Sequence, residues 1–156
     1  MQTNAIIAAL FAAATASGAV LKREATSFNV TGFSASCIPH SVLCVYGFNV
    51  ITIPASASPS GNESPAVCQL MLQGPDLLPA VDPTGCANGG AYSWSVALQD
   101  GGLQLSVTTP QDSHGNYTGS YAITSDQLII EQNGAVVDQR YTGPASFEVP
   151  IGAPSA

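Results

Sequence analysis

Residues 37–44 read CIPHSVLC, two cysteines that bracket a proline, a histidine and a serine. These residue types occur together in metal sites, in catalytic Cys/His pairs and in disulfides. A zinc site needs four Cys or His ligands, in pairs separated by about two to four residues. Here six residues separate Cys37 from Cys44, and seventeen separate Cys68 from Cys86. A catalytic pair needs a free thiol, which an even number of cysteines in an exported chain disfavours.

The N-terminus has the features of an export signal. Residues 5–16 are uncharged and rich in Ala, and this run of about 12 residues is shorter than the ~20 needed to cross a bilayer. Small residues follow it, so we expect a signal peptide at 1–18, with an uncleaved apolar helix as the alternative. The dibasic pair Lys22-Arg23 predicts a short pro-segment at 19–23. The expected product is a secreted, extracellular protein.

Removal of these N-terminal segments would make the chain strongly acidic. The whole chain has three Lys and Arg against ten Asp and Glu, a formal charge of −7. Without residues 1–23, Arg140 is the single Lys or Arg and faces ten Asp and Glu. The formal net charge of the remaining chain is therefore about −9. Nucleic-acid binding needs several Lys or Arg to neutralise phosphates, and an anionic membrane surface repels such a chain. We therefore expect neither partner.

Four cysteines in an oxidising export route predict two disulfides, with three possible connectivities. Local spacing favours Cys37–Cys44 and Cys68–Cys86. Seven steps of extended chain would hold Cys37 and Cys44 ~23 Å apart, whereas a disulfide brings Cα atoms to ~5.5–6 Å. The chain must therefore turn between them, and the intervening Pro-His-Ser supplies turn residues. We interpret this segment as a covalent staple.

Few other residues have spacings typical of catalysis. Glu131, Asp138 and Glu148 fall on predicted strands, where two of them could form a glycosidase pair ~5–10 Å apart, although charges on alternating strands face solvent by default. His40 and His114 lie in predicted turns and form no recognisable triad. We expect no enzyme, metal or cofactor, with a small cell-wall hydrolase that uses a strand carboxylate pair as the alternative.

Apolar residues alternate with a period of two along most of the chain, which indicates β-strands. In each of two predicted strands the pattern places four apolar residues on one face. They are Cys44, Tyr46, Phe48 and Val50 in 43–53, and Tyr92, Trp94, Val96 and Leu98 in 92–98. The predicted strands are 27–33, 43–53, 67–72, 92–98, 103–107, 120–124, 126–130, 135–143 and 146–151. Tyr92, Trp94 and Tyr121 could line a ligand pocket, although inward-facing aromatics on strands belong first to the core.

Turn signals separate the predicted strands. Asp-Gly-Gly at 100–102 and Asn-Gly at 133–134 predict tight hairpins, since these residues accept positive φ, and longer turns are predicted at 74–85 and 111–116. The fold class is therefore all-β, a single antiparallel β-barrel or β-sandwich of about 8–9 strands. One disulfide-stapled domain is expected at 24–156, with a loose C-terminal tail from about residue 151.

Three N-glycosylation sequons begin at Asn29, Asn62 and Asn116. Asn62 lies in the most polar predicted loop, and Asn116 lies beside a Gly-containing turn. Asn29 falls on a predicted strand, so it needs an outward face, which inward-pointing Phe28 and Val30 would provide.

Several motifs together resemble a known family. They are FNVTGFSASCIPHSVLCVYGFNV (28–50), Cys68, LLPAV (77–81), Cys86, the strand around Trp94, GGLQLSV (101–107) and QRYTGPASFEV (139–149). The chain resembles, over most of 27–149, the Alternaria major allergen family of fungal secreted β-barrel proteins, which includes hypersensitive-response elicitors. The resemblance implies a disulfide between Cys68 and Cys86, and neither catalytic residues nor a cofactor.

The resemblance also implies how such a protein works. It implies an apoplastic protein that plants perceive or that interferes with plant defence proteins, and some members are linked to small phenolic ligands. The family prototype has an additional cysteine that joins two barrels, whereas local pairs account for all four cysteines here, so we expect a monomer or a non-covalent dimer. The expected function is that of a secreted fungal effector or elicitor that binds a plant apoplastic protein or a small phenolic ligand. The alternatives are the hydrolase and a small-ligand carrier.

Overall fold

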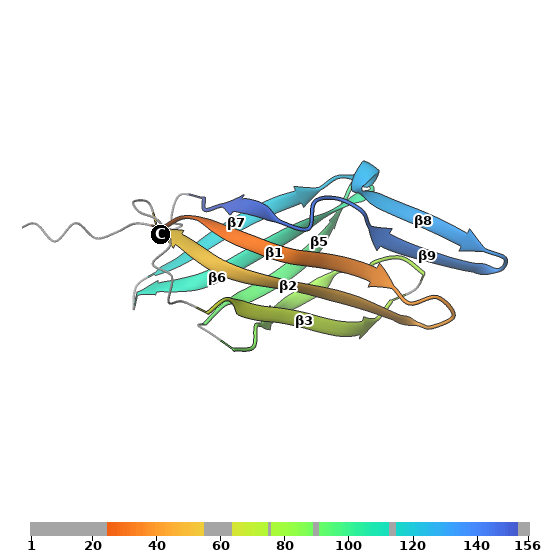
Figure 1. Cartoon of the computed structure of the whole chain (residues 1–156), viewed down its shortest axis with the longest axis horizontal. Helices are drawn as coiled ribbons and strands as arrows, with labels where there is room; N and C mark the ends of the chain where they lie inside the picture. The colour runs from red at the N-terminus through yellow and green to blue at the C-terminus, as the bar shows by residue number, and fades with distance from the viewer. Residues whose placement is uncertain (1–24, 55–63, 75, 89–90, 113–114, 153–156) are drawn as a thin grey trace, which may run out of the picture.

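The computed structural model describes residues 25–54, 64–74, 76–88, 91–112 and 115–152. The predicted signal peptide and pro-segment, Asn62 and His114 lie outside these residues. The described part contains ten strands and one 3-10 helix (Figure 1). They are β1 (Ala25–Cys37), β2 (Leu43–Pro54), β3 (Ala66–Gln73), β4 (Val81–Gly85), β5 (Ser93–Gln99), β6 (Gly102–Asp112), β7 (Gly115–Ile123), η1 (Ser125–Gln127), β8 (Leu128–Asn133), β9 (Val136–Tyr141) and β10 (Phe147–Pro150). In that part of the chain no helix has the length and apolar character to cross a bilayer.

The strands form two antiparallel sheets, which confirms the all-β antiparallel class. Six strands make one sheet in the order β3-β2-β1-β9-β8, with β10 also paired to β1, and the order β4-β5-β6-β7 makes the other. In Figure 1 the strands of the four-stranded sheet cross behind those of the six-stranded sheet. Isolated bridges, Val67↔Ala87 and Gly119↔Ile151, connect the sheets at their edges. Over the described residues no continuous ladder closes the sheets into a barrel.

The core lies between the two sheets and follows the predicted alternation. The four predicted inward residues of β2 are at most 3% exposed: Cys44, Tyr46, Phe48 and Val50. From the other sheet, Trp94 packs edge-on against Phe48 with ring centroids 5.2 Å apart. Burial raises the pKa of Tyr46, whose hydroxyl donates a hydrogen bond to the Pro79 carbonyl at 2.8 Å. The aromatic pattern of β2 and β5 thus builds the contact between the sheets.

The strand count is higher than predicted because β4 forms where the sequence indicates a turn at 74–85. Pro83 lies in β4, at the register shift between Val81 and Thr84 in its pairing with β5. Proline has no N–H for a ladder, so it is tolerated mainly at sheet edges and bulges, and β4 is an edge strand. The predicted turn at 111–116 is also shorter, since β6 and β7 extend into it.

Both disulfides favoured by local spacing are present. Cys37 and Cys44 lie directly opposite each other in the β1–β2 pairing, on either side of the turn. Cys68 of β3 joins Cys86, which directly follows β4, so this bond links the two sheets. Beside it, Val67 and Ala87 exchange two backbone hydrogen bonds at 2.8 and 2.7 Å.

The chain stays attached to the sheets after β10. The Ile151 N–H donates to the Thr26 carbonyl at 3.1 Å, and the Gly152 N–H donates to the Thr118 carbonyl at 3.0 Å. The first two residues of the predicted tail are therefore hydrogen-bonded to β1 and β7, and residues 153–156 lie outside the described residues.

Replacing Cys68 and Cys86 together by alanine should lower the free energy of unfolding by about 3 kcal/mol, because the 19-residue loop is no longer closed in the unfolded chain. The Cys37→Ala/Cys44→Ala double variant should lose about 2.5 kcal/mol, because its loop is shorter. Urea denaturation followed by circular dichroism measures both. A loss below about 1 kcal/mol in the first variant would contradict a constraining role for the bond between the sheets.

Candidate functional site

Two hollows lie on either side of the β5–β6 turn. They have volumes of about 640 and 320 Å³ and share Leu98, Gln99, Asp100 and Gly102 as a common wall. The larger hollow extends over the end of β7 to Ser125 at the start of η1. The smaller hollow is mainly apolar and extends over Leu77, Leu78, Leu103, Leu128 and Gln139. We call the two hollows together the turn groove.

The turn between the hollows depends on two glycines. Gly101 has φ +77°, in the left-handed region that glycine adopts without strain, so the tight hairpin predicted from Asp-Gly-Gly is confirmed. Gly102 is required for a different reason, because a Cβ there would collide with the backbone carbonyl of Ile123. A Cβ at Gly101 would lie 3.6 Å from the Ser125 Cβ. The turn is therefore packed against the corner between β7 and η1, which makes it a rigid wall.

Gly102→Ala should destabilise the fold by about 1–3 kcal/mol, since the added methyl group can be accommodated only if backbone moves. Gly47→Ala is the matched control on β2, because its Cβ would meet only the Ser34 hydroxyl at an ordinary 3.6 Å. That control should be neutral or slightly stabilising. Thermal and urea unfolding measure both changes, and equal stability of the two variants would show that the turn is not packed as described.

The smaller hollow is built from the leucines around Gln139. Leu78 is 2% exposed, and its N–H donates to Gln139 Oε1 at 3.0 Å, which holds the loop before β4 against β9. Leu98 is 62% exposed, although it lies on the predicted face of β5 with buried Trp94 and Val96. It pairs with buried Leu103 and shares its face. The alternation continues there, but Val96 is both the last buried residue of β5 and the last one paired with β4, so Leu98 lies beyond that pairing.

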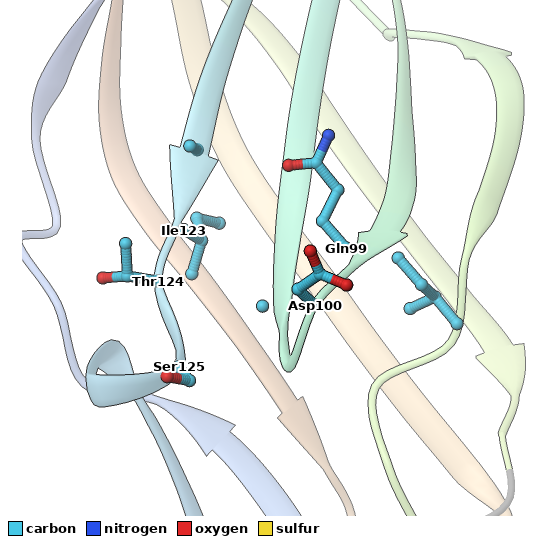
Figure 2. Close-up of a pocket in the computed structure, with 8 residues that line it drawn as sticks. Gln99, Asp100, Ile123, Thr124 and Ser125 are labelled. Atoms are coloured by element: carbon cyan, nitrogen blue, oxygen red, sulfur yellow. The ribbon is translucent and has the colours of Figure 1, made fainter.

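The larger hollow is the more polar of the two. Figure 2 shows Gln99 and Asp100 on one side, and Thr124 and Ser125 on the other. The Thr124 N–H donates to Gln127 Oε1 at 3.1 Å, which caps η1 and holds this wall in place. Thr124 and Ser125 thus line one side of the hollow and the Asp100 carboxylate lines the other, while the Thr124 hydroxyl donates to Gln127 Oε1 at 3.4 Å. These groups can accept and donate hydrogen bonds to a ligand.

The structure does not bring the predicted pocket aromatics together. Trp94 is 1% exposed, and its Nε1 has no hydrogen-bond partner within the described residues. The Tyr92 hydroxyl lies 2.6 Å from the Thr52 hydroxyl, and Tyr121 stacks on Phe147 with centroids 3.9 Å apart. None of the three lines the turn groove. They serve the core and its rim, as inward-facing aromatics of strands generally do.

The ending YTGPASFEV folds around one aromatic cluster. Phe33 packs edge-on against both Tyr141 and Phe147, at 4.9 and 5.5 Å. The Tyr141 hydroxyl donates to the Pro144 carbonyl at 2.9 Å. Burial, with a smaller effect of Tyr121, raises the pKa of Tyr141 to about 12. This motif is therefore structural in the described fold.

Two of the three strand carboxylates lie opposite each other. Glu131 and Asp138 pair across the β8–β9 hairpin, whereas Glu148 lies on β10 opposite Asn29. Asp138 is 5% exposed, so the expectation that strand carboxylates face solvent is wrong for this residue. Among the described residues its Oδ1 has no hydrogen-bond partner. Arg140 binds Glu131 through Nη2 and Nε at 2.7 and 3.1 Å, and this hydrogen bonding raises the pKa of Arg140.

Metal-ligand geometry is absent from the described part of the chain. It contains no group of three or more His, Cys, Asp or Glu side chains that could hold an ion. His40 lies exposed in the β1–β2 turn, with φ 60°, in the segment predicted to turn. Its position inside the Cys37–Cys44 loop agrees with the interpretation of that loop as a staple.

The two sequons within the described residues differ in exposure. Asn116 is exposed on β7 near the β6–β7 turn, whereas Asn29 is half-buried on β1 between β2 and β10. Phe28 and Val30 are fully buried, so Asn29 does point outward as its sequon requires.

We expect a glycan at Asn116, because a bulky glycan fits best on an exposed strand near a turn. In a glycosylating host, Asn116→Gln should remove one glycan from the intact mass, and Asn29→Gln should leave the mass of the glycans unchanged. The reverse result would show that exposure in the folded state does not select the sequon.

Comparisons with known proteins supply no relative for this chain. No family model matches it, and neither a curated protein nor a solved structure does. The similarity to the Alternaria major allergen family stays a prediction from the motifs.

Proposed function

We propose that the protein acts by non-covalent recognition through the turn groove, as a secreted fungal effector or elicitor. The observation that carries this proposal is the exposure of Leu98, at 62%, on the rigid wall between two hollows. Ligand sites typically occupy about 300–1,000 Å³ and combine apolar lining with a few polar groups. The two hollows meet both conditions, with leucines in one and Asp100, Thr124 and Ser125 around the other.

In this proposal the two sheets and the disulfides are the scaffold that holds the turn groove in place for its partner. The two sheets form the faces of an open sandwich, and the disulfides hold its edges so that the groove exists before a partner arrives. Preorganisation reduces the entropy lost on binding. The partner is a plant apoplastic protein or a small phenolic ligand, as the resemblance implies, and the strongly acidic chain is extracellular.

A hydrolase is the second candidate function, and one observation favours it. Asp138 is buried opposite Glu131, and one of its carboxylate oxygens has no partner in the described structure. A buried carboxylic acid beside a second carboxylate is the arrangement that glycosidases use. Against this, Arg140 occupies Glu131 with two hydrogen bonds to one oxygen, which holds that carboxylate in an ion pair.

Infiltration of the purified protein into leaves separates the two functions. Leu98→Ser should raise the dose needed for cell death or a defence response by about tenfold, because truncating one of the few residues that anchor an interface costs more than about 1 kcal/mol. Met71→Ser is the matched control, since Met71 is an equally accessible apolar residue, 56% exposed, on the outer face of β3. Glu131→Gln and Asp138→Asn should retain the response.

Two results would decide against recognition by the groove. Equal activity of the Leu98→Ser and Met71→Ser variants would show that the groove is not used. Loss of activity in Asp138→Asn, with an unchanged circular dichroism spectrum, would favour the hydrolase.

A further inference from the structure

We infer that the turn groove binds an extended basic peptide segment, with an apolar side chain in the leucine-lined hollow and a Lys or Arg two positions away beside Asp100. This inference rests on the proposal that the groove is the binding site. It adds the chemistry of the partner, and the shape, lining and charge of the two hollows indicate that chemistry.

The shape of the groove suits an extended chain. One rigid turn separates the two hollows, and both share its residues as a wall. In an extended chain, side chains two positions apart point to the same side and lie ~6.6–7 Å from each other. In the proposed complex, a peptide crosses the turn and places one side chain in each hollow, while the intervening side chain points to solvent.

The lining assigns a different kind of side chain to each hollow. Leu77 and Leu98 are 43% and 62% exposed at the mouth of the smaller hollow, and Leu78 and Leu103 are buried beneath them. An apolar side chain there would remove leucine surface from water. Both hollows share Leu98 and Asp100, but the larger one has no further leucine and adds Thr124 and Ser125, so its lining suits a cation beside the Asp100 carboxylate.

Charge over the described residues favours a basic partner. Asp126 follows Ser125 in η1, so a second acidic residue lies one position along the chain from the wall of the larger hollow. Arg140 is the single Lys or Arg in residues 25–152, and Glu131 already binds it. The resulting negative field attracts basic ligands and repels acidic ones. A second copy of the chain is a poor partner because its described residues offer no other Lys or Arg.

The test uses the purified protein, expressed from the full coding sequence and labelled with ¹⁵N. It is titrated with a short capped peptide containing Leu-Ser-Arg between glycines, and amide shifts are followed by NMR. Three matched peptides replace this motif by Leu-Ser-Glu, Ala-Ser-Arg and Leu-Arg-Ser. The first removes the cation, the second removes the apolar group, and the third puts the two groups on opposite sides of an extended chain.

The Leu-Ser-Arg peptide should shift amides of residues 98–102 and 123–125 and should bind more tightly than all three controls. Asp100→Asn should weaken its binding about two- to fivefold, and Leu98→Ser should weaken it about tenfold. Glu148→Gln makes the same charge change on β10, outside the residues that line either hollow, and should leave binding almost unchanged. Binding should also weaken as salt is added.

Equal binding of the Arg and Glu peptides would overturn the inference, as would shifts outside the groove or an equal effect of Asp100→Asn and Glu148→Gln. Absence of binding by all four peptides would also overturn it. If Leu98→Ser still reduced the leaf response in that case, the groove would remain the recognition site with a different partner chemistry. If Leu98→Ser changed neither binding nor the leaf response, both proposals would fail.

Discussion

The edge-on contact between Trp94 and Phe48 joins the two sheets, and the remaining structure depends on this junction. Tyr46 also packs against this indole, with ring centroids 6.0 Å apart, so one tryptophan contacts two neighbouring inward positions of β2. Large aromatic side chains bury more surface than aliphatic ones and prefer such edge-on geometry. The alternation of β2 and β5 is therefore held in register by the residues that most need burial.

Covalent bonds reinforce this junction at its margins. The Cys68–Cys86 bond ties β3 to the end of β4, beside the backbone pair Val67↔Ala87. The Cys37–Cys44 bond closes the β1–β2 hairpin, and a Cβ at Gly74 would meet the Cys44 sulfur at 2.7 Å. Close packing of the loop after β3 on this sulfur helps to place the leucines that line the smaller hollow. The Cys37–Cys44 disulfide thus supports the groove through the loop that packs on it.

The groove arises where the aromatic junction ends. Beyond Val96, β5 is no longer paired with β4, and Leu98 is exposed while its partner Leu103 is buried. Packing of Gly102 against the Ile123 carbonyl keeps the uncovered turn in a single position. An exposed apolar residue on a fixed wall is suited to recognition, and the acidic side chain at the same turn favours a partner with a positive charge.

The sequence by itself determined the class of the fold, the hairpin turns and the disulfide spacing. These features are local, because alternation, positive-φ glycines and short cysteine loops depend on neighbours along the chain. Only the tertiary structure decided which alternating positions are covered. In the folded chain Leu98 is exposed to solvent, whereas Asp138 is buried. Pro83 is part of an edge strand. Tyr92 and Tyr121 contact different partners, Thr52 and Phe147. Whether an alternating position is buried depends on which other segments pack over it. The periodicity of a single strand does not encode where those segments end.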